Sequence, residues 1–182
     1  MNARNLAMIG MGAAAVVALS LYYHFSRPAA GPVAHVENEF EFTAQGTWQS
    51  VAPLFGALAE RGWAGDRWNP IFLYPRPARD TPGEVFIINH GHLHATWVNT
   101  ALDLVNGHIQ YAYTIPGVQA VLIDISLQVV TATSTDVKVV YQRTALSPRF
   151  NQHVTEQGNR DRTSAKEWET AINAYLKHAD AE

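Results

Sequence analysis

The chain has 182 residues, of which 47% are hydrophobic and 16% charged, and its formal net charge at pH 7 is −3. This length suits one domain with a sizeable core, and the composition excludes a disordered chain. The negative charge and the scattered Lys and Arg residues argue against nucleic-acid binding, which needs a clustered basic surface. Because the chain has no cysteine, thiolate catalysis and cysteine metal ligands are excluded as well.

The N-terminal segment predicts a membrane anchor. Residues 6–25 are almost uncharged, and about twenty apolar residues at about 1.5 Å each can cross a bilayer core. A cleaved signal peptide is the alternative, but cleavage after Ala30 or Ala34 would place a proline at position −3, which is a poor match. We therefore expect residues 1–33 to form an anchor or signal segment with a linker. The domain that follows, residues 34–180, is expected to lie tethered outside the cytoplasm, in the periplasm or the extracellular space.

Alternating apolar and polar residues predict an antiparallel sheet in most of the domain. The first strand alternates glutamates with apolar side chains such as Phe40 and Phe42, which is typical of a half-buried strand. A hairpin is expected around residues 105–107, which end in Asn-Gly. Strands are expected at residues 35–44, 71–74, 84–89, 94–102, 108–115, 118–131 and 136–145.

Short helices are expected after the first strand, and one longer helix is expected after the last strand. Thr47 is a plausible N-cap, and Pro53 should separate a short first helix from a second one at residues 54–61. Residues 147–162 are polar, and we expect them to be irregular. A capping-box pattern at residues 164–167 then starts a final helix. The apolar stripe of that helix consists of Trp168, Ala171, Ile172, Tyr175, Leu176 and Ala179. A sheet with one apolar face must bury that face against another element, and we expect this helix to cover it. The expected fold class is therefore α+β.

The order of these motifs resembles a known superfamily. The segment from Thr47 to Pro70, which holds Trp63 and Trp68, resembles the helix pair and corner of START-like proteins, also called SRPBCC or helix-grip proteins. The polyketide cyclase/dehydrase-like branch is the most similar. The other matches are Pro82–Phe86, His90, Thr96–Val98, Thr144–Ser147, Trp168–Glu169, Ile172 and Tyr175–Leu176.

The resemblance implies a specific architecture and a ligand. It implies a curved antiparallel sheet of six or seven strands wrapped on the long C-terminal helix, with two short helices after the first strand. Between helix and sheet, such proteins carry a cavity for lipids, sterols, polyketides or other apolar molecules. The resemblance implies no metal and no cofactor.

Twelve inward positions are the candidate ligand-binding residues. Counting from the hairpin turn, Val98 should share a face with Tyr111 and Tyr113, whose phenols could orient a ligand or simply pack on the helix. Arg143 could pair with a ligand carboxylate or extend to solvent. The full set is Phe40, Phe42, Val98, Tyr111, Tyr113, Ile123, Ile125, Val139, Tyr141, Arg143, Trp168 and Ile172.

Three closely spaced histidines form the other notable group. On a continuous strand, His90, His92 and His94 would share one face and could ligate zinc. Gly91 favours a turn instead, in which the three are polar loop residues. We therefore expect no metal site.

Three functions fit these observations. The first is a membrane-tethered domain that binds or carries a hydrophobic small molecule, such as a lipid or a polyketide, in a cavity of at least a few hundred cubic ångströms. The alternative is a cyclase/dehydrase-type enzyme acting on an apolar substrate, with Tyr111, Tyr141 and Arg143 converging on one point and His90 near the rim. A third is a partner-binding or stress-response module that works through the outer face of the sheet and has a collapsed interior.

Overall fold

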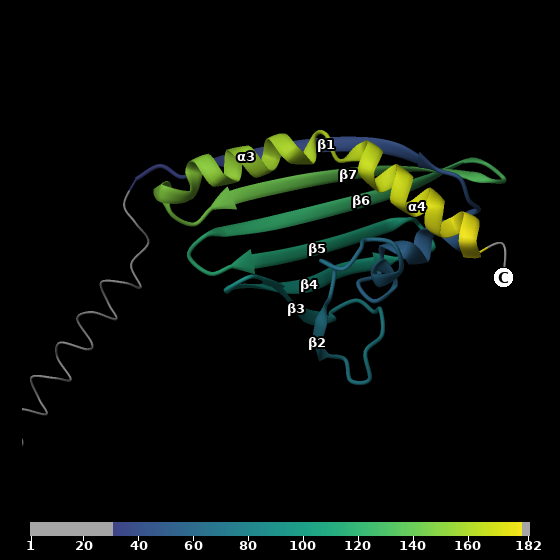
Figure 1. Cartoon of the computed structure of the whole chain (residues 1–182), viewed down its shortest axis with the longest axis horizontal. Coiled ribbons are helices and arrows are strands. Elements are labelled where there is room, and N and C mark those ends of the chain that lie inside the picture. The colour runs from purple at the N-terminus through teal and green to yellow at the C-terminus, as the bar shows by residue number, and fades with distance from the viewer. Residues whose placement is uncertain (1–30, 180–182) are drawn as a thin grey trace, which may run out of the picture. The chain divides into compact units, whose positions relative to one another are not determined.

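The computed structural model of the protein describes residues 31–179 (Figure 1). The apolar segment at residues 6–25 lies outside this range. Within the range, no helix is both long enough and apolar enough to cross a bilayer.

Seven antiparallel strands form one sheet in the order β1-β7-β6-β5-β4-β3-β2. Each predicted strand is confirmed to within two residues at either end. The first strand pairs with the last, so β1 lies at one edge of the sheet and the short β2 at the other. The strands are β1 (His35–Ala44), β2 (Ile71–Tyr74), β3 (Val85–His90), β4 (Leu93–Asp103), β5 (His108–Ile115), β6 (Gln119–Thr131) and β7 (Ser134–Ala145).

Strand alternation separates the two faces of the sheet as predicted. In β1, Phe40 and Phe42 are buried, whereas Glu39 and Glu41 are exposed. The two glutamates lie 2.8 and 3.4 Å from the ammonium group of Lys138 on β7. Ion pairs this exposed contribute little to stability, so the sheet is held mainly by its backbone ladder and by its buried face.

Three short helical segments connect β1 to β2: α2 (Trp48–Val51), η1 (Ala52–Phe55) and η2 (Ala59–Gly62). Thr47 caps α2 as predicted, because its hydroxyl accepts a hydrogen bond from the backbone N–H of Ser50. The second predicted helix is instead two separate 3₁₀ turns. The reason is Asp80, whose carboxylate accepts the N–H groups of Leu58 and Ala59 at 2.6 and 3.2 Å and packs against extended Gly56.

The expectation that residues 147–162 are irregular was wrong. The segment forms η3 (Pro148–Phe150) and the eleven-residue helix α3 (Asn151–Asp161). Only Val154, Gly158 and Asp161 of α3 are buried, so the helix has no apolar stripe that periodicity could detect. Gly158 allows close packing on β1, since a Cβ atom there would lie 2.8 Å from a methyl group of Val36.

The last helix, α4 (Ala165–Ala179), follows α3 after a short turn, and the two helices run along the β1–β7 side of the sheet (Figure 1). Ile172 and Leu176 are buried, while Trp168 and Tyr175 pack against the same core. The apolar stripe predicted from the sequence is therefore the face that α4 turns towards the sheet, except for Ala179, which is exposed at the end of the helix.

The register of β4 differs from the prediction and moves Val98 to the outer face. Near the turn, Leu102 lies opposite Ile109, as counting from the hairpin requires, but the register shifts between Asn99 and Ala101. Beyond this bulge Val98 lies opposite Ala112, and its neighbours Trp97 and Asn99 point inward instead. A single extra residue reverses the face of every side chain that follows it.

The β4–β5 turn provides a test of the packing of α2. Gly107 has a φ of +69°, and a Cβ atom there would lie 2.3 Å from the indole of Trp48, whose Nε1 donates to the carbonyl oxygen of Leu104. We expect Gly107→Ala to lower the free energy of unfolding by about 2–4 kcal/mol, from left-handed backbone strain together with overpacking. Urea denaturation measures this loss.

Gly91→Ala is the matched control. Gly91 has a φ of +66°, but nothing lies within 4 Å of its Cβ position, so only the backbone strain of about 1–2 kcal/mol applies. Equal losses in the two variants would contradict the packing of Trp48 against this turn.

Candidate functional site

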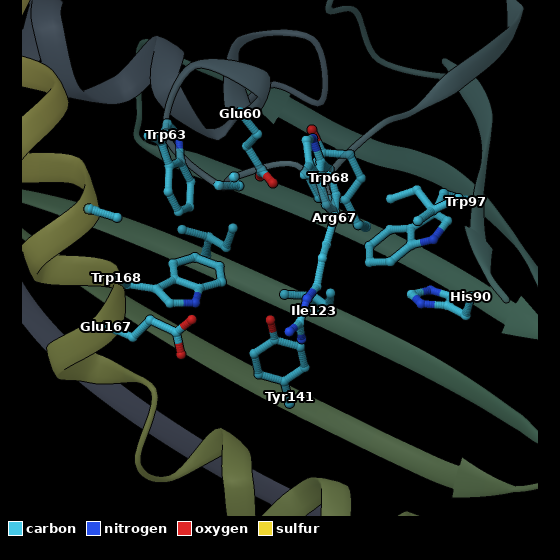
Figure 2. Close-up of a pocket in the computed structure, with 16 residues that line it drawn as sticks. Glu60, Trp63, Arg67, Trp68, His90, Trp97, Ile123, Tyr141, Glu167 and Trp168 are labelled. Atoms are coloured by element: carbon cyan, nitrogen blue, oxygen red, sulfur yellow. The ribbon is translucent and has the colours of Figure 1, made fainter.

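A cavity of about 480 Å³ lies between α4, the segment around η2 and the inner face of the sheet (Figure 2). This volume falls within the range of small-molecule sites, so the interior is not filled by its own side chains. The lining residues are Glu60, Trp63, Ala64, Gly65, Arg67, Trp68, Ile88, His90, Trp97, Tyr111, Ile123, Ile125, Tyr141, Glu167, Trp168 and Ala171.

Tryptophans form much of the wall of the cavity. Trp63 and Trp168 meet edge to face with ring centroids 5.2 Å apart, and Trp68 meets Trp97 in the same way at 5.4 Å. The indole N–H groups of Trp63 and Trp68 donate to the carbonyl oxygens of Leu54 and Ala57, both at 2.8 Å. These bonds satisfy the polar edges and fix both rings, so the corner between η2 and β2 forms a rigid apolar wall.

The structure divides the twelve predicted ligand-binding residues into four groups. Five line the cavity: Tyr111, Ile123, Ile125, Tyr141 and Trp168. Four belong to the surrounding buried core: Phe40, Phe42, Val139 and Ile172. Tyr113 and Arg143 form a polar network with α3, and Val98 lies on the outer face of the sheet.

Arg143 does not extend to solvent, because α3 supplies a partner. The side chain is only 6% exposed, and its guanidinium donates to both carboxylate oxygens of Asp161, at 2.6 and 2.8 Å. It also donates to the hydroxyl of Tyr113 at 2.7 Å and lies 4.7 Å from the ring centroid of Tyr141. Removing one partner of such a buried pair typically costs about 3–5 kcal/mol. Arg143 therefore fixes α3 to β7, and its pairing with a ligand carboxylate stays a prediction.

The predicted convergence of Tyr111, Tyr141 and Arg143 on one point is not found. The Tyr111 hydroxyl donates to the carbonyl oxygen of Phe55 at 2.9 Å, which leaves its ring as part of the wall. Tyr141 keeps its hydroxyl directed into the cavity (Figure 2). Burial raises the pKa of Tyr141 above its ordinary value, so it acts there as a neutral hydrogen-bonding group.

Glu60 is the polar residue of the site that sequence reasoning missed. It is 5% exposed, lines the cavity and directs its carboxyl group inward from η2 (Figure 2). Desolvation raises its pKa well above the ordinary value, and the nearby carboxyl groups of Asp80 and Glu84 raise it further. In the sequence, Glu60 stands beside Arg61 in a predicted helix, and this pattern is typical of a solvent-exposed position. A 3₁₀ turn lacks the 3.6-residue period that would have marked it as buried.

Buried Glu84 and half-buried Asp80 complete an acidic group behind this wall. Glu84 is fully buried, and its carboxyl oxygen accepts the backbone N–H of Thr81 at 3.0 Å. Burial raises the pKa of Glu84 to about 7, and the charge of Asp80 acts in the same direction, while hydrogen bonds from Thr81 and Tyr111 oppose the shift.

The histidine cluster lies at a turn, as Gly91 suggested. β3 ends at His90 and β4 begins at Leu93, so the strand is broken between His90 and His94. His94 pairs with the side-chain oxygen of Asn89 at 2.6 Å, and His90 lies at the edge of the cavity. In residues 31–179, no three His, Cys, Asp or Glu side chains are grouped as metal ligands.

The buried acids predict that stability falls as the pH rises. A glutamate in the unfolded chain has a pKa near 4.5, and folded Glu84 has one of about 7, so the folded state binds more protons between these values. Below about pH 4.5, Glu84 is protonated in both the folded and the unfolded state, so its burial carries no charge penalty. The cost grows to about 3 kcal/mol as the pH passes 7, at 1.36 kcal/mol per pKa unit.

Urea denaturation between pH 5 and pH 8 measures this effect. The wild-type free energy of unfolding should decline over the range, and the decline should be smaller by about 3 kcal/mol in Glu84→Gln. Parallel curves for the two proteins would show that Glu84 ionises normally in the folded state.

Comparisons with known proteins identify the fold. No family model and no curated protein matches the chain. Norcoclaurine synthase from Thalictrum flavum is similar in structure, with a TM-score of 0.58, 9% identity, and coverage of 79% of this chain and 87% of the enzyme. A Staphylococcus aureus protein of unknown function has a TM-score of 0.61 at 10% identity, with coverage of 82% and 98%. A Rhizobium loti protein has a TM-score of 0.54 at 19% identity, with coverage of 80% and 99%. At these identities the likeness shows the fold alone: the described domain has the START-like, helix-grip fold.

Proposed function

We propose that this protein binds a hydrophobic small molecule, lipid-like or polyketide-like, in the cavity between α4 and the sheet. The observation that carries the proposal is a pocket of about 480 Å³ that reaches from the surface in between α4 and the sheet. Interiors normally pack as densely as organic crystals and leave few voids larger than a water molecule. A pocket of this size is typical of a small-molecule site.

The distribution of polar groups supports the same function. Tryptophan and isoleucine side chains line the interior, whereas the exposed side chains of Arg67, His90 and Glu167 lie around its edge. Apolar walls with a few polar groups are typical of sites for small organic molecules. The edge marked by these three side chains is the entrance in this proposal.

A cyclase/dehydrase-type enzyme is the second candidate, and Glu60 is the observation that favours it. Burial raises the pKa of Glu60, and a carboxylic acid with a raised pKa can act as a proton donor to a substrate carbonyl. The hydroxyl of Tyr141 faces the same cavity (Figure 2). Liquid chromatography with mass spectrometry separates the two functions, because dehydration lowers the mass of the substrate by that of water and cyclisation alters its retention time, whereas a carrier returns the molecule unchanged.

The third hypothesis, a partner-binding or stress-response module that works through the outer face of the sheet, has less support. It needs a collapsed interior, and the interior is open. A shallow hollow does lie on the outer face of the sheet, and its floor includes Val98, Ala112 and Leu122.

The N-terminal segment gives this proposal a location. The run at residues 6–25 is long and apolar enough to span a bilayer, which supports a membrane-tethered carrier that lies in the periplasm or the extracellular space. Full-length protein should stay in the membrane pellet after washing with alkaline carbonate, while a variant that begins at residue 31 should be released. Release of the full-length protein, with an unshortened mass, would contradict the tether.

Binding of an uncharged probe tests the main proposal. We expect the full-length protein to bind 2-(1-naphthyl)ethanol, measured by calorimetry. Ala171→Phe should weaken this binding at least tenfold, because Ala171 lines the cavity and a phenyl ring there would occupy it.

Ala179→Phe is the control, because Ala179 lies exposed at the end of the same helix. Its affinity should equal that of the wild type. Equal binding by all three proteins would place the probe outside the cavity, and no binding by the wild type would refute the proposal.

A further inference from the structure

Glu60 is the one carboxyl group of the buried acidic set that has no hydrogen-bond partner among the described side chains and backbone. Asp80 accepts two backbone N–H groups, and Glu84 accepts one from Thr81. Glu60 is 5% exposed, and its carboxyl group faces open space in the cavity rather than protein (Figure 2). A carboxyl group in this position is available to pair with a ligand, because it is committed to no hydrogen bond within the described protein.

The charges around Glu60 favour a cation over an anion. The groups that raise its pKa after desolvation are the carboxyls of Asp80 and Glu84. The phenols of Tyr111 and Tyr141 also lie within its electrostatic reach. At the edge of the cavity, Arg67 and Glu167 carry opposite formal charges, and His90 adds an imidazole whose pKa is lowered by burial. A bound anion would face Glu60 with the carboxyl groups of Asp80 and Glu84 behind it, whereas a bound cation would be attracted by each of them that ionises.

The aromatic rings beside Glu60 also favour a cation. Trp63, Trp168 and Tyr141 line the cavity together with this carboxyl group. The faces of indole and phenol rings attract a cation within about 6 Å of their centroids, and the attraction grows when water is excluded. A carboxyl group among aromatic rings therefore suits a molecule with a positively charged nitrogen on an apolar body.

We propose that the ligand of this cavity carries a basic amine on an apolar or aromatic body, and that Glu60 receives the amine nitrogen as its ion-pair partner. This rests on the proposed binding function and adds the chemical class of the ligand. The amine arrives as an ammonium ion, Glu60 releases its proton to solvent, and the carboxylate then accepts hydrogen bonds from the ammonium group. Charge and protons balance, because one proton leaves for each amine bound.

Three probes with the same ring system and different charges test the inference. Full-length protein is titrated by calorimetry with 2-(1-naphthyl)ethylamine, 2-(1-naphthyl)ethanol and 1-naphthylacetate. At pH 7 we expect the amine to bind at least tenfold more tightly than the alcohol, and the carboxylate to bind more weakly than both. Titrations at pH 6 in two buffers of different ionisation enthalpy should show the release of close to one proton per amine bound. The affinity for the amine should rise with pH as the proton of Glu60 is lost more easily.

Two variants assign the preference to Glu60. Glu60→Gln should lose both the preference for the amine and the proton release, while it still binds the alcohol, which also shows that the cavity is intact. Glu156→Gln removes an exposed carboxylate of α3 that does not line the cavity and should keep both effects. Equal affinities for amine and alcohol in the wild type would overturn the inference and leave the binding function standing. A failure of all three probes to bind would overturn both.

Discussion

The packing of Trp168 is the interaction on which the rest of this structure depends. Its indole contacts Phe40 and Phe42 on β1, Phe55 on η1 and Trp63 beside η2, with ring centroids 5.2–6.5 Å apart. One side chain thus joins the last helix to the first strand and to the short helices that follow it. Large rings at this junction hold α4 away from the middle of the sheet, and the space that remains is the cavity.

The two helices are held to the sheet by different interactions, which lie on either side of the short turn between them. At the end of α3, Arg143 and Asp161 form a buried, bidentate ion pair that fixes α3 to β7. At the start of α4, the aromatic cluster around Trp168 fixes that helix. Glu60 and Glu84 oppose folding as the pH rises, because each of these carboxylates must form away from water and near the carboxyl group of Asp80. Proteins often retain such costly groups where they bind or react.

Sequence patterns could predict the sheet and the last helix because both bury one regular apolar face. The same patterns failed to predict segments whose buried residues are polar or irregularly spaced. The face of α3 contains Gly158 and Asp161, whose roles depend on Val36 and Arg143 far away in the chain. The bulge after Asn99 reverses the direction of Val98 without any glycine or proline to mark it. The inward direction of Glu60 depends on Asp80 interrupting the preceding helix through two hydrogen bonds, which no local pattern contains.

The central claim is that the space beneath Trp168 is a stable, apolar chamber in the folded protein. A crystal structure determined under xenon pressure tests it most directly, because xenon enters apolar cavities. The account predicts xenon atoms between α4 and the sheet, bordered by Trp63, Trp168 and Ile123. An interior without xenon, in which the indole of Trp168 has moved in to close the space, would contradict it.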